Sequence, residues 1–231
     1  MFRPARLITI LILTLVIYAA FFATPVGVRA EGNFDPDAVA AQEVEIWKAE
    51  KGHSDFSLYL GAIVMLREQE RYSWFRAVQA GFYLGRAMNT FIDLHTRYER
   101  VLPDLEDAAQ IQKDWMHATF DPAAVARAQL NWWVTRRMPN LNSVDSVSQL
   151  MAEEYGLRYH LGADRMMAAA TLRTQALDER DEGGIDPPWP TISKRLAESY
   201  RALSTAIQLG RRRAEMADLV AGDSVPAANP K

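Results

Sequence analysis

Apolar residues recur at intervals of three and four through most of the chain after residue 30, which is the spacing of one helix face. No stretch shows a convincing period-two alternation, and no Asn-Gly or Asp-Gly hairpin turn occurs. This pattern most constrains the fold, because it predicts an all-α domain of about eight helices. Two apolar stripes show the spacing well: Leu58, Ala62 and Leu66 in one segment, and Trp74, Val78 and Phe82 in the next.

Prolines and glycines divide this pattern into segments. A proline favours the first turn of a helix, and a glycine often follows the last one. The expected helices span 36–51, 55–71, 74–98, 103–118, 122–138, 143–155, 160–181 and 190–209, and residues 221–231 are expected to form a disordered tail.

The first 30 residues have the three-part layout of a secretory signal. Arg3 and Arg6 precede an uncharged apolar run at residues 7–23, and small residues then predict cleavage after Ala30. The run is also close to the shortest length that spans a bilayer, so an uncleaved anchor is the alternative. Either way, the rest of the chain is predicted to be exported, and it is periplasmic or tethered to the inner membrane. Membrane contact is expected only through residues 7–23 if they are retained.

The charge balance of the exported part argues against a nucleic-acid partner. The first 30 residues hold three arginines and no acidic residue, so the remainder carries 23 basic against 29 acidic side chains, a formal charge of −6. Such a body has no general positive field for phosphates. The chain has no cysteine, which excludes disulfides, thiolate metal sites and a cysteine nucleophile.

Two segments of the chain resemble one another. Residues 34–47 read FDPDAVAAQEVEIW and residues 120–133 read FDPAAVARAQLNWW, with seven identities in fourteen positions. Part of the match has a local cause, since Asp before Pro makes a good helix start and Phe with Val provides a hydrophobic staple. This cause does not explain the shared Ala-Val-Ala or the final Trp.

The match therefore favours an internal duplication over convergence on one helix start. Pro103 and Pro190, which lie 87 positions apart, support it. We expect two four-helix repeats, at about 34–117 and 120–208, that pack around a pseudo-twofold axis as one domain over 31–220.

The repeat also places a carboxylate where a core residue belongs. Val39, Glu43 and Trp47 share one helix face, and so do the equivalent Val125, Gln129 and Trp133. Because the two flanking residues must face inward, Glu43 should be at least half buried. A buried carboxylate needs a partner.

Two interpretations of Glu43 follow. The first is structural: a hydrogen bond, to Gln129 for example, or a position at the edge of the stripe. The second is functional: Glu43 and Gln129 bind a ligand or handle protons between pocket walls made by Trp47 and Trp133.

Catalytic and metal-binding motifs are missing from the sequence. It contains no Gly-x-Ser-x-Gly, His-Glu-x-x-His, Gly-x-Gly-x-x-Gly or P-loop, and we expect no cofactor. Its single Glu-x-x-His, at 50–53, falls at a helix end, so no metal site is expected. Gly81 and Gly85 are instead expected to allow two helices to approach closely.

Two functions stay open at this point. The first is a non-enzymatic binding, scaffolding or accessory module of the cell envelope with a protein partner. The alternative is an enzyme or small-ligand-binding protein whose site lies between the repeats, around Glu43 and Gln129.

Overall fold

The computed structural model describes residues 4–22, 32 and 34–222 of the 231-residue chain, and every regular element in that part is helical. Eight α-helices follow the N-terminal segment, as the sequence predicts. Helix α1 (Pro4–Phe22) precedes them. The others are α2 (Pro36–Lys51), α3 (Asp55–Glu68), α4 (Trp74–Asp93), the short 3₁₀ helix η1 (Tyr98–Val101), α5 (Leu102–Met116), α6 (Pro122–Arg137), α7 (Val144–Tyr159), α8 (Ala163–Glu182) and α9 (Trp189–Gly222).

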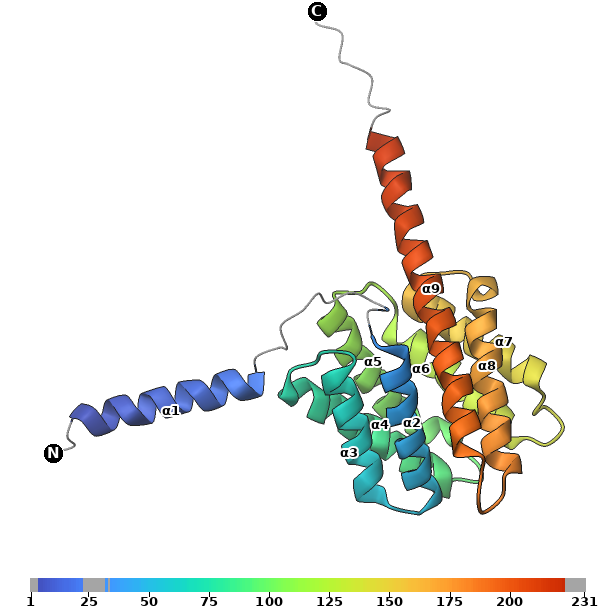
Figure 1. The fold of residues 1–231 in the computed structure, drawn as a ribbon, viewed down its shortest axis with the longest axis horizontal. Coiled ribbons are helices and arrows are strands. Elements are labelled where there is room, and N and C mark those ends of the chain that lie inside the picture. Colours follow the sequence, from blue (N-terminus) through green and yellow to red (C-terminus); the bar gives the residue numbers. More distant parts are fainter. Residues whose placement is uncertain (1–3, 23–31, 33, 223–231) are drawn as a thin grey trace, which may run out of the picture.

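Helices α2 to α9 form a closed ring. Each packs against the next one in the sequence, and α9 lies beside both α8 and α2, so the last helix returns to the first (Figure 1). Short connections favour this neighbour-to-neighbour packing. The ring surrounds a cavity that is lined by residues from several of the helices.

The two matching segments both start helices in the expected way. Asp35 precedes α2, and its side chain accepts hydrogen bonds from the backbone N–H groups of Asp37 and Ala38. Asp121 precedes α6 and accepts from Ala123. Their backbone angles are nearly equal, with φ −83° and ψ 110° at Asp35 and φ −85° and ψ 114° at Asp121. The predicted caps are confirmed.

The largest apolar cluster joins α2, α7, α8 and α9. Met151, Met166, Ile192 and Leu196 are completely buried in it. Burying side chains of this size contributes roughly 1.5–3 kcal/mol each. A smaller cluster holds α4, α5 and α6 together around Leu105. The ring is therefore anchored more strongly on the side of α2 and α8.

Three helix ends differ from the sequence prediction. Helix α4 ends at Asp93 rather than near 98, α7 continues through Gly156 to Tyr159, and α9 continues through Gly210. Both glycines lie inside a helix and not at its end. A Cβ at Gly156 would come within 2.7 Å of the Leu161 backbone oxygen, and a Cβ at Gly210 would collide with the Leu161 side chain. The two glycines allow close packing against the turn between α7 and α8.

The outward face of α4 also corrects the sequence analysis. Trp74, Val78 and Phe82 are exposed, and the inward face is made instead of small residues such as Ala77 and Ala80. Gly81 and Gly85 approach Ile63 and Tyr59 of α3 closely, which confirms the predicted role of these glycines in helix packing. Small residues occupy the inward face of α4 because they let α3 and α4 pack tightly.

Helix α1 projects away from the ring (Figure 1). Large apolar side chains from Ile10 to Phe22 are exposed along it. None of the helices meets the combined length and hydropathy needed to cross a membrane, as far as the described residues go. The predicted cleavage site after Ala30 lies outside the described residues, as does nearly all of the predicted tail, although 221 and 222 are still helical.

Candidate functional site

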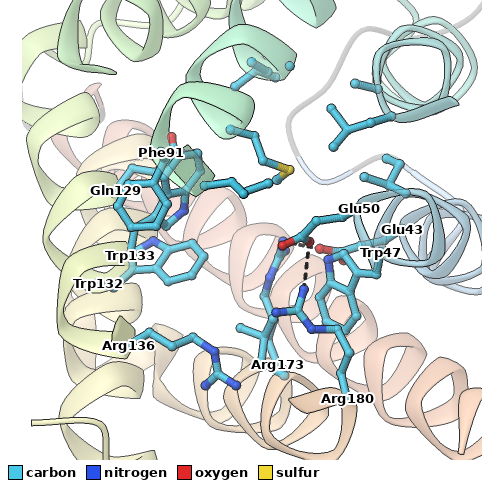
Figure 2. A pocket seen from close by; sticks show the side chains of 18 of the residues that line it. Glu43, Trp47, Glu50, Phe91, Gln129, Trp132, Trp133, Arg136, Arg173 and Arg180 are labelled. Carbon is cyan, nitrogen blue, oxygen red and sulfur yellow. Dashed lines mark hydrogen bonds and ion pairs between the residues drawn. The ribbon is translucent and has the colours of Figure 1, made fainter. Parts of the chain in front are cut away.

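The ring of helices encloses a cavity of about 450 Å³, which we call the central cavity. Its walls come from α2, α3, α4, α6 and α8, and this volume suits a small organic molecule. All four residues singled out from the sequence line it, so the structure brings Glu43, Trp47, Gln129 and Trp133 together (Figure 2).

Glu43 is held in place on the α2 side of the cavity. Its side chain is buried, with the residue 4% exposed. The Tyr200 hydroxyl donates to Glu43 Oε2 at 2.6 Å, and Arg173 Nη2 forms an ion pair with Glu43 Oε1. The predicted burial is confirmed, but the suggested bond to Gln129 is wrong: the partners come from α8 and α9.

Arg173 connects this carboxylate to two tyrosines. Its Nη1 donates to Tyr200 Oη at 3.0 Å and to Tyr155 Oη at 3.3 Å. Glu43, Tyr155, Arg173 and Tyr200 therefore join α2, α7, α8 and α9, and we call this group the Glu43 cluster. Both Glu43 oxygens are engaged, so the carboxylate acts as an anchor and not as a free base.

Burial and charge shift the pKa values in the Glu43 cluster. Burial raises the pKa of Tyr155 to about 12, although Arg173 acts in the opposite direction. Burial likewise holds the pKa of Tyr200 well above its usual range, against the effect of Arg173 and with that of Glu43. Burial works against the charged form of Arg173, but Glu43 and the neighbouring tyrosines together outweigh it, so the pKa of Arg173 is raised. The cluster stays an ion pair flanked by neutral phenols at neutral pH.

Gln129 occupies the matching position on the α6 side of the cavity, but it is held differently. Its amide has no hydrogen-bond partner among the described residues, and the side chain is only partly buried. One turn further along α6, Trp132 donates from Nε1 to Glu154 Oε2 at 2.9 Å. The Trp133 ring beside it lies 5.1 Å from the ring of Phe91. The α6 side therefore offers an amide without a protein partner next to two fixed indoles.

A chain of ion pairs crosses the end of the cavity where α2, α6 and α8 terminate. Arg136 donates to Asp178 at 2.7 Å and to Asp181 at 2.8 Å. Asp181 also accepts from Arg180 at 2.8 Å, and Arg180 reaches Glu50 at 2.9 Å. Arginines suit this end because helix C-termini carry partial negative charge.

The pKa of Asp181 reflects this chain. Burial alone would raise the pKa of the Asp181 carboxyl, but Arg180 and then Arg136 outweigh it and lower the pKa. Arg180 also lies over the Trp47 ring, 5.1 Å from its centroid. The indole that the sequence predicted as a pocket wall is thereby covered by a cation.

Arg137 adds a positive charge to the same end of the cavity. It donates to the backbone carbonyls of Leu94 at 2.6 Å and Ile92 at 3.1 Å, and it stacks 4.2 Å from the Phe91 ring centroid. These bonds satisfy the last carbonyls of α4, which explains why α4 ends earlier than its sequence predicts. In the described part of the chain Arg137 has no carboxylate partner. The lining thus carries four arginines against three carboxylates.

The remaining wall is apolar. It comes from α3, α4 and α8, which contribute Leu58, Met65, Leu84, Met88 and Leu177. Thioether and aliphatic side chains adapt to ligands of different shape. The cavity is therefore amphipathic, with cations at one end and an apolar wall beside Trp132 and Trp133.

The arginines are the site residues that the sequence analysis missed. Arg173, Leu177 and Arg180 follow one another at intervals of four and three, so they share a face of α8. Arg136 and Arg137 each follow a cavity tryptophan by four positions. This spacing is the signal in the sequence that could have indicated them.

No histidine is among the described residues that line the central cavity. His117 and His160 are the C-caps of α5 and α7, in the left-handed conformation with φ values of 54° and 53°. Over the described residues, no group of three or more His, Asp or Glu side chains is arranged to hold a metal ion.

Comparisons with protein-family models, with curated proteins and with solved structures give no match. The site is therefore interpreted from its own geometry.

Proposed function

We propose that this protein binds a small amphipathic anion in the central cavity. The ligand would have an apolar aromatic or acyl body and one acidic group. The observation that carries the proposal is the division of the cavity lining into a group of arginines at one end, of which Arg137 has no carboxylate partner among the described residues, and a continuous apolar wall at the other. Among the functions expected from the sequence, this favours a small-ligand-binding protein over a scaffold.

The apolar body of the ligand would lie against α6 and α4. Trp132 and Trp133 supply flat surfaces that are already fixed by neighbours, so they lose little freedom when a ligand binds. Met88 and Leu84 close the opposite wall. The amide of Gln129, on the same helix as the two tryptophans, offers the ligand both a donor and an acceptor.

The acidic group of the ligand would lie near Arg137. This guanidinium has no carboxylate partner in the described part of the chain, and only some of its N–H groups are used by the α4 carbonyls. Arg136 and Arg180 already pair with acidic side chains. They would therefore attract the acidic group of the ligand through their electrostatic field more than through direct hydrogen bonds. An anion at this end would pair with the one arginine of the lining that has no carboxylate partner in the described part of the chain.

A pair of fluorescent probes tests this proposal. 8-Anilinonaphthalene-1-sulfonate carries a sulfonate, and N-phenyl-1-naphthylamine has the same aromatic skeleton without it. We expect saturable binding of both at one site, with the sulfonate bound about tenfold more tightly, which corresponds to about 1.4 kcal/mol. Arg137→Gln should remove this preference.

A matched control separates local charge from net charge. Arg127 lies on the exposed side of the same helix, α6, and does not line the cavity. Arg127→Gln should leave the preference unchanged. Equal affinity of the wild-type protein for the two probes would overturn the proposal, and so would an equal effect of the two substitutions.

We also propose that the ring arose by duplication, with repeats at about 34–117 and 120–208 related by a pseudo-twofold axis. The equal caps at Asp35 and Asp121 support this, because both helices start with the same geometry. The ring supports it too, since α6 to α9 follow one another in the same neighbour-to-neighbour order as α2 to α5. In this arrangement Glu43 and Gln129 are equivalent positions on opposite walls.

For location, we propose export, with the ring in the periplasm or tethered to the inner membrane. The basic start and apolar run of residues 1–30 support it, as does the exposure of the apolar side chains along α1. N-terminal sequencing of the exported protein tests the cleaved form. A first residue of Glu31 would support cleavage after Ala30, and an intact N-terminus would support the tether.

A further inference from the structure

Large apolar side chains cover the outer surface of α3 and α4. Phe56 is 77% exposed and Phe82 is 48% exposed, and their neighbours are similarly uncovered. Rings of Tyr59 and Phe82 lie 6.0 Å apart, so the side chains of the two helices meet on this surface. We call this surface the aromatic face; it consists of Phe56, Leu60, Trp74, Phe75, Val78 and Phe82.

The exposure of the aromatic face follows from how α4 is built. Its inward side is occupied by alanines and by Gly81 and Gly85, so the large apolar stripe must point outward. Exposed apolar patches of this kind mark surfaces that contact a partner or a membrane. The choice of occupant depends on what else lies next to the face.

Helix α1 meets the aromatic face directly. Rings of Phe21 and Phe22 lie 6.1 and 5.1 Å from the ring of Phe75, at the start of α4. From Ile10 to Phe22 the described side chains of α1 are apolar apart from Thr14 and the Tyr18 hydroxyl, and they surround the whole helix. A helix that is apolar all round suits lipid and not a polar solvent.

Arginines lie over the aromatic rings of the face. The Arg67 guanidinium is 5.2 Å from the Trp74 ring centroid, and that of Arg86 is 5.1 Å from Phe82. Tryptophan and arginine together are typical of the headgroup level of a membrane, where an apolar body meets a charged layer. Arg67 donates to the Tyr72 carbonyl and Arg86 pairs with Asp104, so both cations are held beside the apolar side chains, at the level where anionic headgroups would lie.

We propose that the aromatic face is a membrane-contact surface that lies against lipid headgroups when α1 is embedded in the bilayer. The proposal concerns the chain that keeps α1, and it does not depend on ligand binding in the central cavity. The ring would then lie with α3 and α4 on the membrane and with the opposite helices, α7 and α8, facing away from it.

The absence of cysteine makes the test direct, because a single introduced cysteine can be labelled alone. Val78→Cys places a nitrobenzoxadiazole label on the face at an exposed position. Glu153→Cys places it on the exposed side of α7 as the matched control. Each full-length variant is reconstituted into vesicles of phosphatidylcholine and phosphatidylglycerol, and circular dichroism checks that it is folded.

Lipids that carry a spin label at the headgroup should quench the label at position 78 several-fold more strongly than the label at 153. Equal quenching at the two positions would overturn the proposal. So would fluorescence at position 78 that depends on protein density and not on the spin-labelled lipid, because a second copy of the chain would then cover the face.

Discussion

Helices α2 and α6 begin alike but use the middle of their inward faces differently. Both start with an Asp cap and a Pro, and both direct Val and Trp toward the core. Glu43 of α2 is fixed by Arg173 and Tyr200, whereas Gln129 of α6 has no hydrogen-bond partner among the described residues. The carboxylate on α2 is therefore a structural anchor, whereas the amide on α6 is without a protein partner in the described part of the chain.

A polar residue in a core position can therefore have more than one structural role. The carboxylate could be buried only because α8 and α9 bring a cation and a hydroxyl to it. The amide needs no such support, because a neutral group at the edge of a cavity can bind water or a ligand. Substitutions at both walls of the cavity and changes of pH test this difference between Glu43 and Gln129.

Removing the cation of the Glu43 cluster should have the largest effect. Arg173→Met leaves the Glu43 carboxylate buried without its ion pair and removes the bonds to both tyrosines, so we expect a loss of about 3–5 kcal/mol in the free energy of unfolding. Denaturant unfolding measures it. Arg137→Met, at the other end of the cavity, should cost about 1 kcal/mol. Similar losses in the two variants would contradict the contrast.

High pH should have the next largest effect, because it reduces the stability that the Glu43 cluster provides on the α2 side of the cavity. The folded-state pKa of Tyr155 is raised to about 12, so its contribution to stability is complete below pH 10 and is lost as the pH rises through 12. Stability should fall by about 1.4 kcal/mol per pH unit for this tyrosine. Tyr155→Phe should reduce the slope of unfolding free energy between pH 10 and 12 by that amount. An unchanged slope would mean that the phenol is not held neutral.

Exchange at the two equivalent positions compares them directly. Glu43→Gln removes the ion pair with Arg173 and should cost about 2 kcal/mol. Gln129→Leu removes an amide without protein partners and should change stability by less than about 0.5 kcal/mol. Thermal unfolding of both variants measures the difference. If Gln129→Leu proved the more damaging, the assignment of anchor and open position would have to be reversed.

Low pH should have the smallest effect, on the chain of ion pairs at the end of the cavity where α2, α6 and α8 terminate. The folded-state pKa of Asp181 is lowered from 3.8, so its contribution is present above that pH and is lost as the pH falls through the folded value. The side chain is 49% exposed, and solvent screening keeps the effect below about 1 kcal/mol. Asp181→Asn should flatten the acid side of a melting-temperature profile slightly; a steeper acid side would exclude this ion-pair chain as a stabiliser.

The helix starts could be predicted from the sequence because their causes are local. Asp35 and Asp121 cap helices through atoms two or three residues away, and the staple from Phe34 to Val39 spans only six residues. The burial of Glu43 could also be predicted, since the residues around it on its helix face fix the orientation. Its partners could not, because Arg173 and Tyr200 are 130 and 157 residues away in sequence.

The same limit explains the errors. Gly156 and Gly210 look like helix ends, but their function is set by contact with Leu161. The end of α4 is set by Arg137, which lies 43 residues beyond Leu94. The stripe through Trp74, Val78 and Phe82 has the spacing of a core face, and periodicity alone does not tell which side of a helix will be covered.

Fluorine NMR of the protein labelled with 5-fluorotryptophan tests the central claim most directly. Three of the six tryptophans, Trp47, Trp132 and Trp133, line the cavity, whereas Trp74, Trp115 and Trp189 do not. Single Trp→Phe variants assign the six resonances. On addition of 8-anilinonaphthalene-1-sulfonate, the three cavity resonances should shift and saturate together while the other three stay unchanged. A shift confined to Trp74, on the aromatic face, or no shift of Trp132 and Trp133, would contradict ligand binding in the central cavity.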